Sequence, residues 1–205
     1  MEKEYTEQES LQLITEMINA ARNDMQNGRG DLVILWGYVI ASLALGNFAL
    51  IQMLGVHNPL IYLIWTLTIP LFIISAIIES RKERRTKVKN RITSIIASLW
   101  NGYAITVCVA LTMLYAGAAI FRSSEIYALI NPLILSLTGL AIFVTGRIFR
   151  FKPFVYGGIV FWTGAIVCIL GSGYMYIQGF HFIVSAICMI AGFIVPGHLL
   201  NRKKE

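Results

Sequence analysis

Charge is scarce in this sequence and absent from its six longest apolar stretches. Of the 205 residues, 14% are charged and 57% are hydrophobic, whereas about a quarter of the residues are charged in soluble domains. No Asp, Glu, Lys or Arg lies within the six stretches. This pattern excludes a soluble globular fold and is typical of a polytopic membrane protein.

Cysteine and histidine are also few, with three residues of each. The cysteines lie within apolar stretches, and their spacing fits neither a disulfide framework nor a zinc site. His57, His181 and Glu125 are expected at one membrane boundary and are suitable zinc ligands, but no local motif supports a site. No Ser or Cys has an evident basic companion at depth. We therefore predict no metal, no cofactor and no catalytic residue.

The apolar stretches predict an all-α fold, a polytopic membrane helix bundle of six transmembrane helices arranged as three hairpins. Each stretch is close to the roughly twenty residues that cross a bilayer. The short connections between them favour antiparallel neighbours. Residues 1–30 form a cytoplasmic arm, residues 31–200 the transmembrane domain and residues 201–205 a basic tail. The predicted spans are about 32–54, 60–78, 95–118, 126–146, 154–174 and 181–199.

Lys and Arg residues are distributed unequally about these spans. If all six stretches cross the membrane, every Lys and Arg except Arg122 falls on one side. Cytoplasmic loops carry the Lys/Arg excess, so we place both termini in the cytoplasm. The net charge of +6 does not indicate nucleic acid, because the bases lie at span ends, where topology and anionic lipid account for them.

Residues 6–27 of the arm predict an amphipathic helix. Thr6 and Glu9 have the spacing of a capping box, and the following apolar residues recur at helical intervals on one face. We predict that this face contacts the bundle itself, a second copy or a cytosolic protein partner. The residues of the predicted contact face are Leu11, Ile14, Ile18 and Met25.

The arm and the loop after the second span carry opposite charge. Residues 1–31 have a net charge of −4, and residues 81–91 have a net charge of +6. An acidic helix is poorly suited to anionic lipid, so we expect the arm to fold back over the basic loop. The loop itself is predicted to contact anionic lipid headgroups, through Arg81, Lys82, Arg84 and Arg85.

Polar residues within the spans leave two interpretations open. The absence of ionisable side chains argues against proton-driven transport, but Asn, Gln and Thr residues such as Asn47 and Asn131 remain. These either line a polar cavity or make interhelical hydrogen bonds. Pro70 and Pro196 mark either a broken helix at a binding site or a simple kink. Glycines at seven-residue intervals indicate a packing seam between helices: Gly139 and Gly146, and Gly157, Gly164 and Gly171.

Several segments resemble a family of small, uncharacterised six-transmembrane-helix bacterial inner-membrane proteins with an N-terminal amphipathic cytoplasmic helix. They are Glu9-Ser-Leu-Gln-Leu-Ile-Thr-Glu-Met-Ile18, Leu35-Trp-Gly-Tyr38, Phe151-Lys-Pro153 and Ile194-Val-Pro-Gly-His-Leu-Leu-Asn201. The resemblance covers nearly the whole chain and implies the topology, but it carries over no functional residue.

From these features we predict a non-enzymatic integral membrane protein whose arm makes regulatory or assembly contacts. The alternative is a small-solute transporter or facilitator with a polar cavity between the spans. A membrane enzyme acting on lipid is the least supported class.

Overall fold

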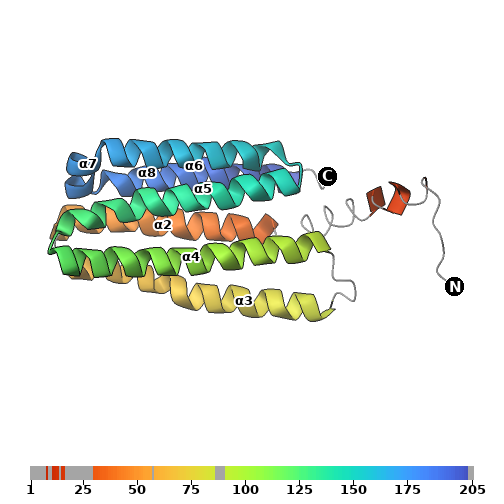
Figure 1. Ribbon diagram of the computed structural model, residues 1–205, viewed down its shortest axis with the longest axis horizontal. Helices are drawn as coiled ribbons and strands as arrows, with labels where there is room; N and C mark the ends of the chain where they lie inside the picture. The colour runs from red at the N-terminus through yellow and green to blue at the C-terminus, as the bar shows by residue number, and fades with distance from the viewer. Residues whose placement is uncertain are drawn as a thin grey trace.

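The computed structural model describes residues 8, 11–13, 15–16, 30–56, 58–85 and 91–202. Within these ranges the chain is helical, without strands, and the helices run side by side along one long axis (Figure 1). Five helical stretches are long and apolar enough to cross a membrane. The all-α class is confirmed, and five of the six predicted spans correspond to these stretches: Val33–Leu54, Ser94–Phe121, Ser124–Ile148, Lys152–Leu170 and Phe180–Arg202.

The chain forms eleven elements over residues 30–202, some of which are 3₁₀- or π-helical. In order they are α2 (Gly30–Leu54), the 3₁₀-helix η2 (Pro59–Leu67), α3 (Thr68–Arg85), α4 (Arg91–Phe121), the 3₁₀-helix η3 (Ser124–Leu129), α5 (Ile130–Ile148), α6 (Lys152–Leu170), α7 (Ser172–Gln178), α8 (Phe180–Met189), the π-helix η4 (Ile190–Ile194) and α9 (Val195–Arg202).

The second predicted span is divided between η2 and α3, and only Leu63–Ser75 counts as an apolar helix there. Asn58 caps η2 by accepting a hydrogen bond from the backbone N–H of Leu60 at 3.0 Å, and Pro59 occupies the first helical position. A 3₁₀-helix is tighter and longer per residue than an α-helix. The hydroxyls of Thr66 and Thr68 donate to carbonyl oxygens one turn earlier, which satisfies part of the irregular backbone.

The fifth and sixth spans are also interrupted. α6 ends at Leu170, before the predicted limit of residue 174, and Gly171 separates it from the short helix α7. The predicted connection from Met175 to Phe180 is therefore largely helical, and it turns at Gly179, where φ is +74°. In the last span the backbone widens to a π-helix one turn before Pro196, and the N–H of Val195 bonds to the carbonyl of Ile190. A proline lacks the N–H that a regular helix needs, which accounts for an irregular turn here.

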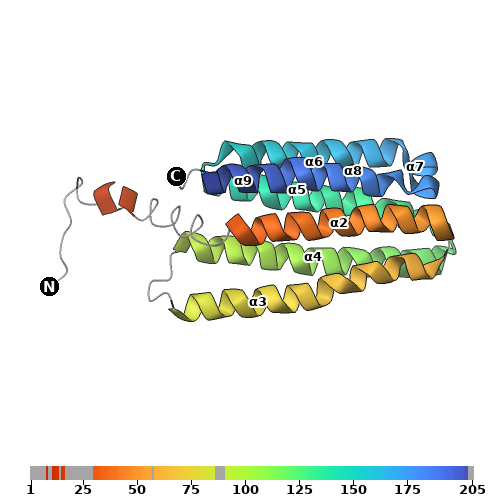
Figure 2. The same cartoon turned by 180° about the vertical axis from the view of Figure 1, so that it is seen from behind.

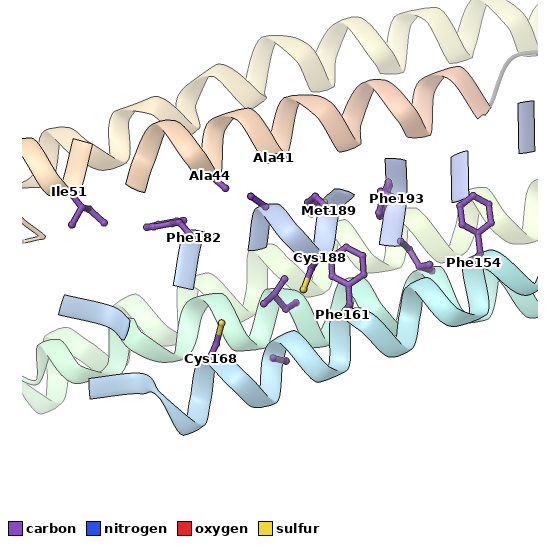
Figure 3. Packing of buried hydrophobic residues seen from close by; sticks show 14 of the residues in the cluster. Ala41, Ala44, Ile51, Phe154, Phe161, Cys168, Phe182, Cys188, Met189 and Phe193 are labelled. Atoms are coloured by element: carbon purple, nitrogen blue, oxygen red, sulfur yellow. The ribbon is translucent and has the colours of Figure 1, made fainter. Parts of the chain in front are cut away.

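The core lies between α2, α5, α6 and the last span, whereas α3 and α4 lie at the periphery (Figures 1 and 2). The most extensive packing is between α5 and α6 and between α2 and α8. Neither pair is one of the three predicted hairpins. Figure 3 shows the core side chains meeting from α2, α6 and α8. The largest fully buried side chains are Phe161, Ile61, Leu135, Ile142 and Asn47.

Glycines set the spacing between α5 and α6, in agreement with the predicted packing seam except at Gly171, which ends α6 and faces Met175 four residues later. A Cβ at Gly158 would lie 2.8 Å from the carbonyl oxygen of Gly139, and a Cβ at Gly146 would lie 2.7 Å from the backbone nitrogen of Val155. Gly157 and Gly164 face a different neighbour, because Gly157 lies against Gly192 and Gly164 against Cys188. The seam therefore joins α5, α6 and the last span at backbone distance.

Candidate functional site

Basic residues gather at one end of the bundle, which we call the basic end. It comprises the end of α3, the start of α4, the α5–α6 connection and the end of α9 (Figure 1). Arg147, Arg150, Lys152 and Arg202 are all exposed there. Arg122 and Glu125 lie at the opposite end, in the connection between α4 and α5. Basic residues from separate parts of the sequence thus gather at the same end of the folded bundle.

The predicted lipid-contact residues lie in the last turns of α3, at the basic end. Arg81, Lys82, Arg84 and Arg85 are helical, so they are distributed around the helix rather than forming a loop. Of the predicted loop, only residues 86–90 fall outside the described residues. The helix therefore extends about two turns beyond the last apolar residues.

The arm is described only in part. Leu11 is helical and 64% exposed, and Leu13 is 46% exposed, so these apolar side chains are not covered by the bundle. The hydroxyl of Thr15 donates to the carbonyl oxygen of Leu11 at 2.8 Å, four residues earlier. Ile14, Ile18 and Met25 lie outside the described residues. The contact face predicted for the arm stays a prediction.

Polar side chains within the spans meet at one cluster near the end opposite the basic end. We call it the Asn131 cluster; it consists of Asn131, Cys168, His181 and Ser185. The side-chain amide of Asn131 donates to the carbonyl oxygen of His181 at 2.8 Å, and the hydroxyl of Ser185 donates to the amide oxygen of Asn131 at 2.8 Å. The cluster thereby links α5 to α8, with the thiol of Cys168 beside it.

The Asn131 cluster has the residue types of a hydrolytic site but not its geometry. Both hydrogen bonds of the Ser185 hydroxyl go to carbonyl oxygens, one on Asn131 and one on His181. The His181 ring nitrogen Nδ1 lies 3.1 Å from the carbonyl oxygen of Met175, and the ring stacks on Tyr176. A nucleophile needs a base within hydrogen-bond reach, and here the imidazole is directed to the backbone instead.

Of the three zinc ligands considered from the sequence, the structure describes His181 and Glu125. His57 lies outside the described residues, His181 is buried in α8, and Glu125 is exposed in the first turn of η3. Among the residues that the structure describes, no three His, Cys, Asp or Glu side chains are grouped as a metal ion would need. The hydrogen bonds of the Asn131 cluster connect α5 to α8.

Several other polar side chains of the spans also make hydrogen bonds. The Asn47 amide donates to the carbonyl of Ile61 at 2.9 Å, and the Gln52 amide donates to that of Gln178 at 2.7 Å. The Tyr103 hydroxyl lies 2.9 Å from that of Thr138 and joins α4 to α5. Several threonines bond to a carbonyl four residues earlier in their own helix: Thr106, Thr112, Thr138, Thr145 and Thr163.

The sequence indicated some of the polar residues in these bonds but not which residues bond to one another. Asn131 and His181 were both singled out, but Ser185 and Cys168 were not connected to them. Ser185 follows His181 by four residues, which places both on one face of a helix, and this spacing was the available signal. The contact between Tyr38 and His198, 160 residues apart, left no local signal.

No protein-family model, curated protein or solved structure matches the chain. The features that bear on function are therefore the packed helices, the hydrogen bonds between them and the charge distribution.

Proposed function

We propose that the chain is a non-enzymatic integral protein of the bacterial inner membrane, with six spans and both termini in the cytoplasm. Its cytoplasmic arm makes regulatory or assembly contacts with a second copy or a cytosolic protein. The chain belongs, in this proposal, to the six-helix family that its sequence resembles. The observation that carries the proposal is the filled core, in which Asn47, Tyr103 and Asn131 bond to neighbouring helices.

The length of the second apolar stretch supports a sixth crossing. η2 has nine residues, and the α-helical part of the stretch adds eleven up to residue 78. At about 2 Å per 3₁₀ residue and 1.5 Å per α residue, this gives a rise of about 34 Å. A bilayer core is about 30 Å thick. The irregular segment is thus long enough to cross.

The charge distribution supports the proposed orientation. The basic end collects the Lys and Arg residues of four chain segments, and only Arg122 lies at the other end of the described bundle. A cytoplasmic basic end satisfies the positive-inside rule. It also brings the arm, which precedes α2, to the same side as the end of α3.

The core supports a scaffold more than a transport path. Phe161, Ile61 and Leu135 are at most 1% exposed and occupy the space between the packed helices. Two hollows are grooves on the surface, one along α9 and one between α6 and α8. A path for a polar solute needs an accessible polar lining at depth.

The irregular backbone of two spans is the observation that favours the transport alternative. η2 with Pro70 and η4 with Pro196 interrupt two spans at depth, and broken helices build the substrate sites of many transporters. In this structure the η4 turn is packed against Gly37 and Gly157, which leaves no room for a solute beside those glycines.

Limited proteolysis of the full chain in native membranes tests the arm contact. In the wild type, we expect the arm to be protected, and the double variant Leu11→Asp and Ile14→Asp to be cleaved at least about fivefold faster, because two charges replace the apolar contact. Gln12→Asp is the matched control, since Gln12 lies off the predicted face, and it should behave as the wild type.

Deletion of residues 1–27 distinguishes the scaffold proposal from the transporter alternative. The scaffold proposal predicts that the shortened chain stays in the membrane with unchanged thermal stability and loses its crosslinked partner or its second copy. Equal cleavage of the wild type and the double variant would contradict an arm contact. Unchanged association together with altered solute flux in proteoliposomes would favour the transporter.

A further inference from the structure

A contact between α2 and α9 holds an imidazole at the basic end. The hydroxyl of Tyr38 lies 3.2 Å from Nε2 of His198, and the two rings meet edge to face with their centres 6.1 Å apart. Both side chains are exposed. If the hydroxyl donates to Nε2, the ring proton lies on Nδ1. In that tautomer the imidazole keeps Nδ1–H as a donor on the side away from the tyrosine.

The packing of α9 exposes the face that carries this imidazole. A Cβ at Gly197 would lie 2.5 Å from the side chain of Ile34, so α9 rests closely on α2 along its glycine side (Figure 2). The other side is open and lines a hollow of about 340 Å³. The residues around the hollow are Val195, His198, Leu199 and Arg202.

The lining consists of two neighbouring rows along the helix, one apolar and one basic. Val195 and Leu199, which are 48% and 42% exposed, are four residues apart and share one row, and His198 and Arg202, also four residues apart, share the other. Arg202 ends the helix, one turn beyond His198, and Lys203 and Lys204 follow it in sequence. The carbonyl end of a helix disfavours an anion, and the Arg202 guanidinium supplies the positive charge that an anion needs there.

We propose that this hollow binds one anionic phospholipid, with the phosphate held by the Arg202 guanidinium and the His198 Nδ1–H and an acyl chain lying along Leu199 and Val195. Arg pairs with phosphate through two parallel hydrogen bonds, and basic sites at the cytoplasmic ends of spans hold such headgroups. Tyr38 is a positioning residue, because it touches the imidazole and not the lipid. The site is separate from the arm and does not depend on an arm contact.

The apolar wall distinguishes a lipid from a free phosphate. Inorganic phosphate satisfies Arg202 and His198 but leaves the wall of Val195 and Leu199 without a contact. Each acyl methylene buried against such a wall adds to the affinity. We therefore expect a lipid with an anionic headgroup to bind more tightly than either inorganic phosphate or a zwitterionic lipid.

Lipid titration of the purified full chain, followed by native mass spectrometry, tests the site. Phosphatidylglycerol should bind about tenfold more tightly than phosphatidylcholine, and Arg202→Gln should remove this preference, because a hydrogen bond to a charged group is worth about one order of magnitude or more. Arg147→Gln is the control, since Arg147 is also exposed in a last helical turn at the basic end. It should retain the preference.

Three further variants or probes complete the experiment. Arg202→Lys keeps the charge and should bind with intermediate affinity, and Tyr38→Phe should weaken lipid binding about threefold without lowering Tm. Equal losses in Arg147→Gln and Arg202→Gln would show general charge attraction and overturn the site. Saturable binding of inorganic phosphate as tight as that of the lipid would overturn the lipid as its ligand. Loss of Tm without loss of lipid in Arg202→Gln would show a structural role instead.

Discussion

Gly157 of α6 lies against the backbone of Gly192 in η4: a Cβ at position 157 would come within 2.5 Å of the Gly192 carbonyl oxygen. A backbone atom cannot rotate away as a flexible side chain does. The carbonyl belongs to the turn before Pro196, whose missing N–H already disturbs the helix there. The π-helical turn of the last span therefore coincides with a close backbone contact to α6.

Replacing Gly157 tests this contact. We expect Gly157→Ala to destabilise the bundle by about 1–3 kcal/mol, because the added methyl group separates α6 from the last span. A fluorogenic maleimide measures unfolding in a Cys108→Ala background, since Cys168 and Cys188 are only 2% and 3% exposed before unfolding. Gly102→Ala is the control, because nothing lies within 4 Å of a Cβ there. Equal Tm values for both variants would contradict the close contact.

The Asn131 cluster predicts a coupling between two helices. Asn131→Ala and Ser185→Ala should each lower stability, because each leaves a polar partner in an apolar setting. In a double-mutant cycle, the coupling should be about 0.6–1.7 kcal/mol, the range found for hydrogen bonds in membrane bundles. Thr163→Ala serves as a reference, since that hydroxyl is exposed and bonds within its own helix. Additive effects of the two substitutions would argue against the bond.

The Tyr103–Thr138 bond predicts how α4 is held. The Thr138 hydroxyl also bonds to the carbonyl of Ile134 at 2.7 Å, so Tyr103 is the donor in the pair. Tyr103→Phe should cost about 0.5–1.5 kcal/mol and increase proteolysis at the two ends of α4 before the rest of the bundle opens. Tyr156→Phe, on an exposed residue of α6, is the comparison. Cleavage unchanged from the wild type would show that α4 is held by other contacts.

Single-cysteine labelling tests the sixth crossing. In a chain without its native cysteines, we expect an impermeant maleimide to reach Met53→Cys and Ser124→Cys from the same, outer side of intact cells. Arg147→Cys should react only after permeabilisation. All three residues are exposed. If η2 and α3 did not cross together, residues 53 and 124 would lie on opposite sides, and only one of them would be labelled from outside.

Local sequence predicted the helices better than it predicted their interruptions. The apolar stretches place the spans to within a few residues, but α6 ends at Leu170 because Gly171 follows. Asn-Pro-Leu-Ile occurs at residues 58–61 and 131–134, yet Asn58 caps a 3₁₀-helix while Asn131 bonds across to α8. The same four residues take different roles because their neighbours in space differ, which no local pattern records.

By itself, the sequence determined that this chain forms charge-free apolar helices whose basic ends lie together. Each backbone group in a bilayer needs a partner within its own segment, so composition over about twenty residues suffices for that conclusion. Only the tertiary structure decided that Gly157 meets Gly192, that Asn131 meets Ser185 and that Tyr38 holds His198. These pairs join residues that are between 35 and 160 positions apart, and they follow from which helices pack together. Lipid provides no strong hydrophobic push between helices, so close backbone contacts and polar joints make that choice.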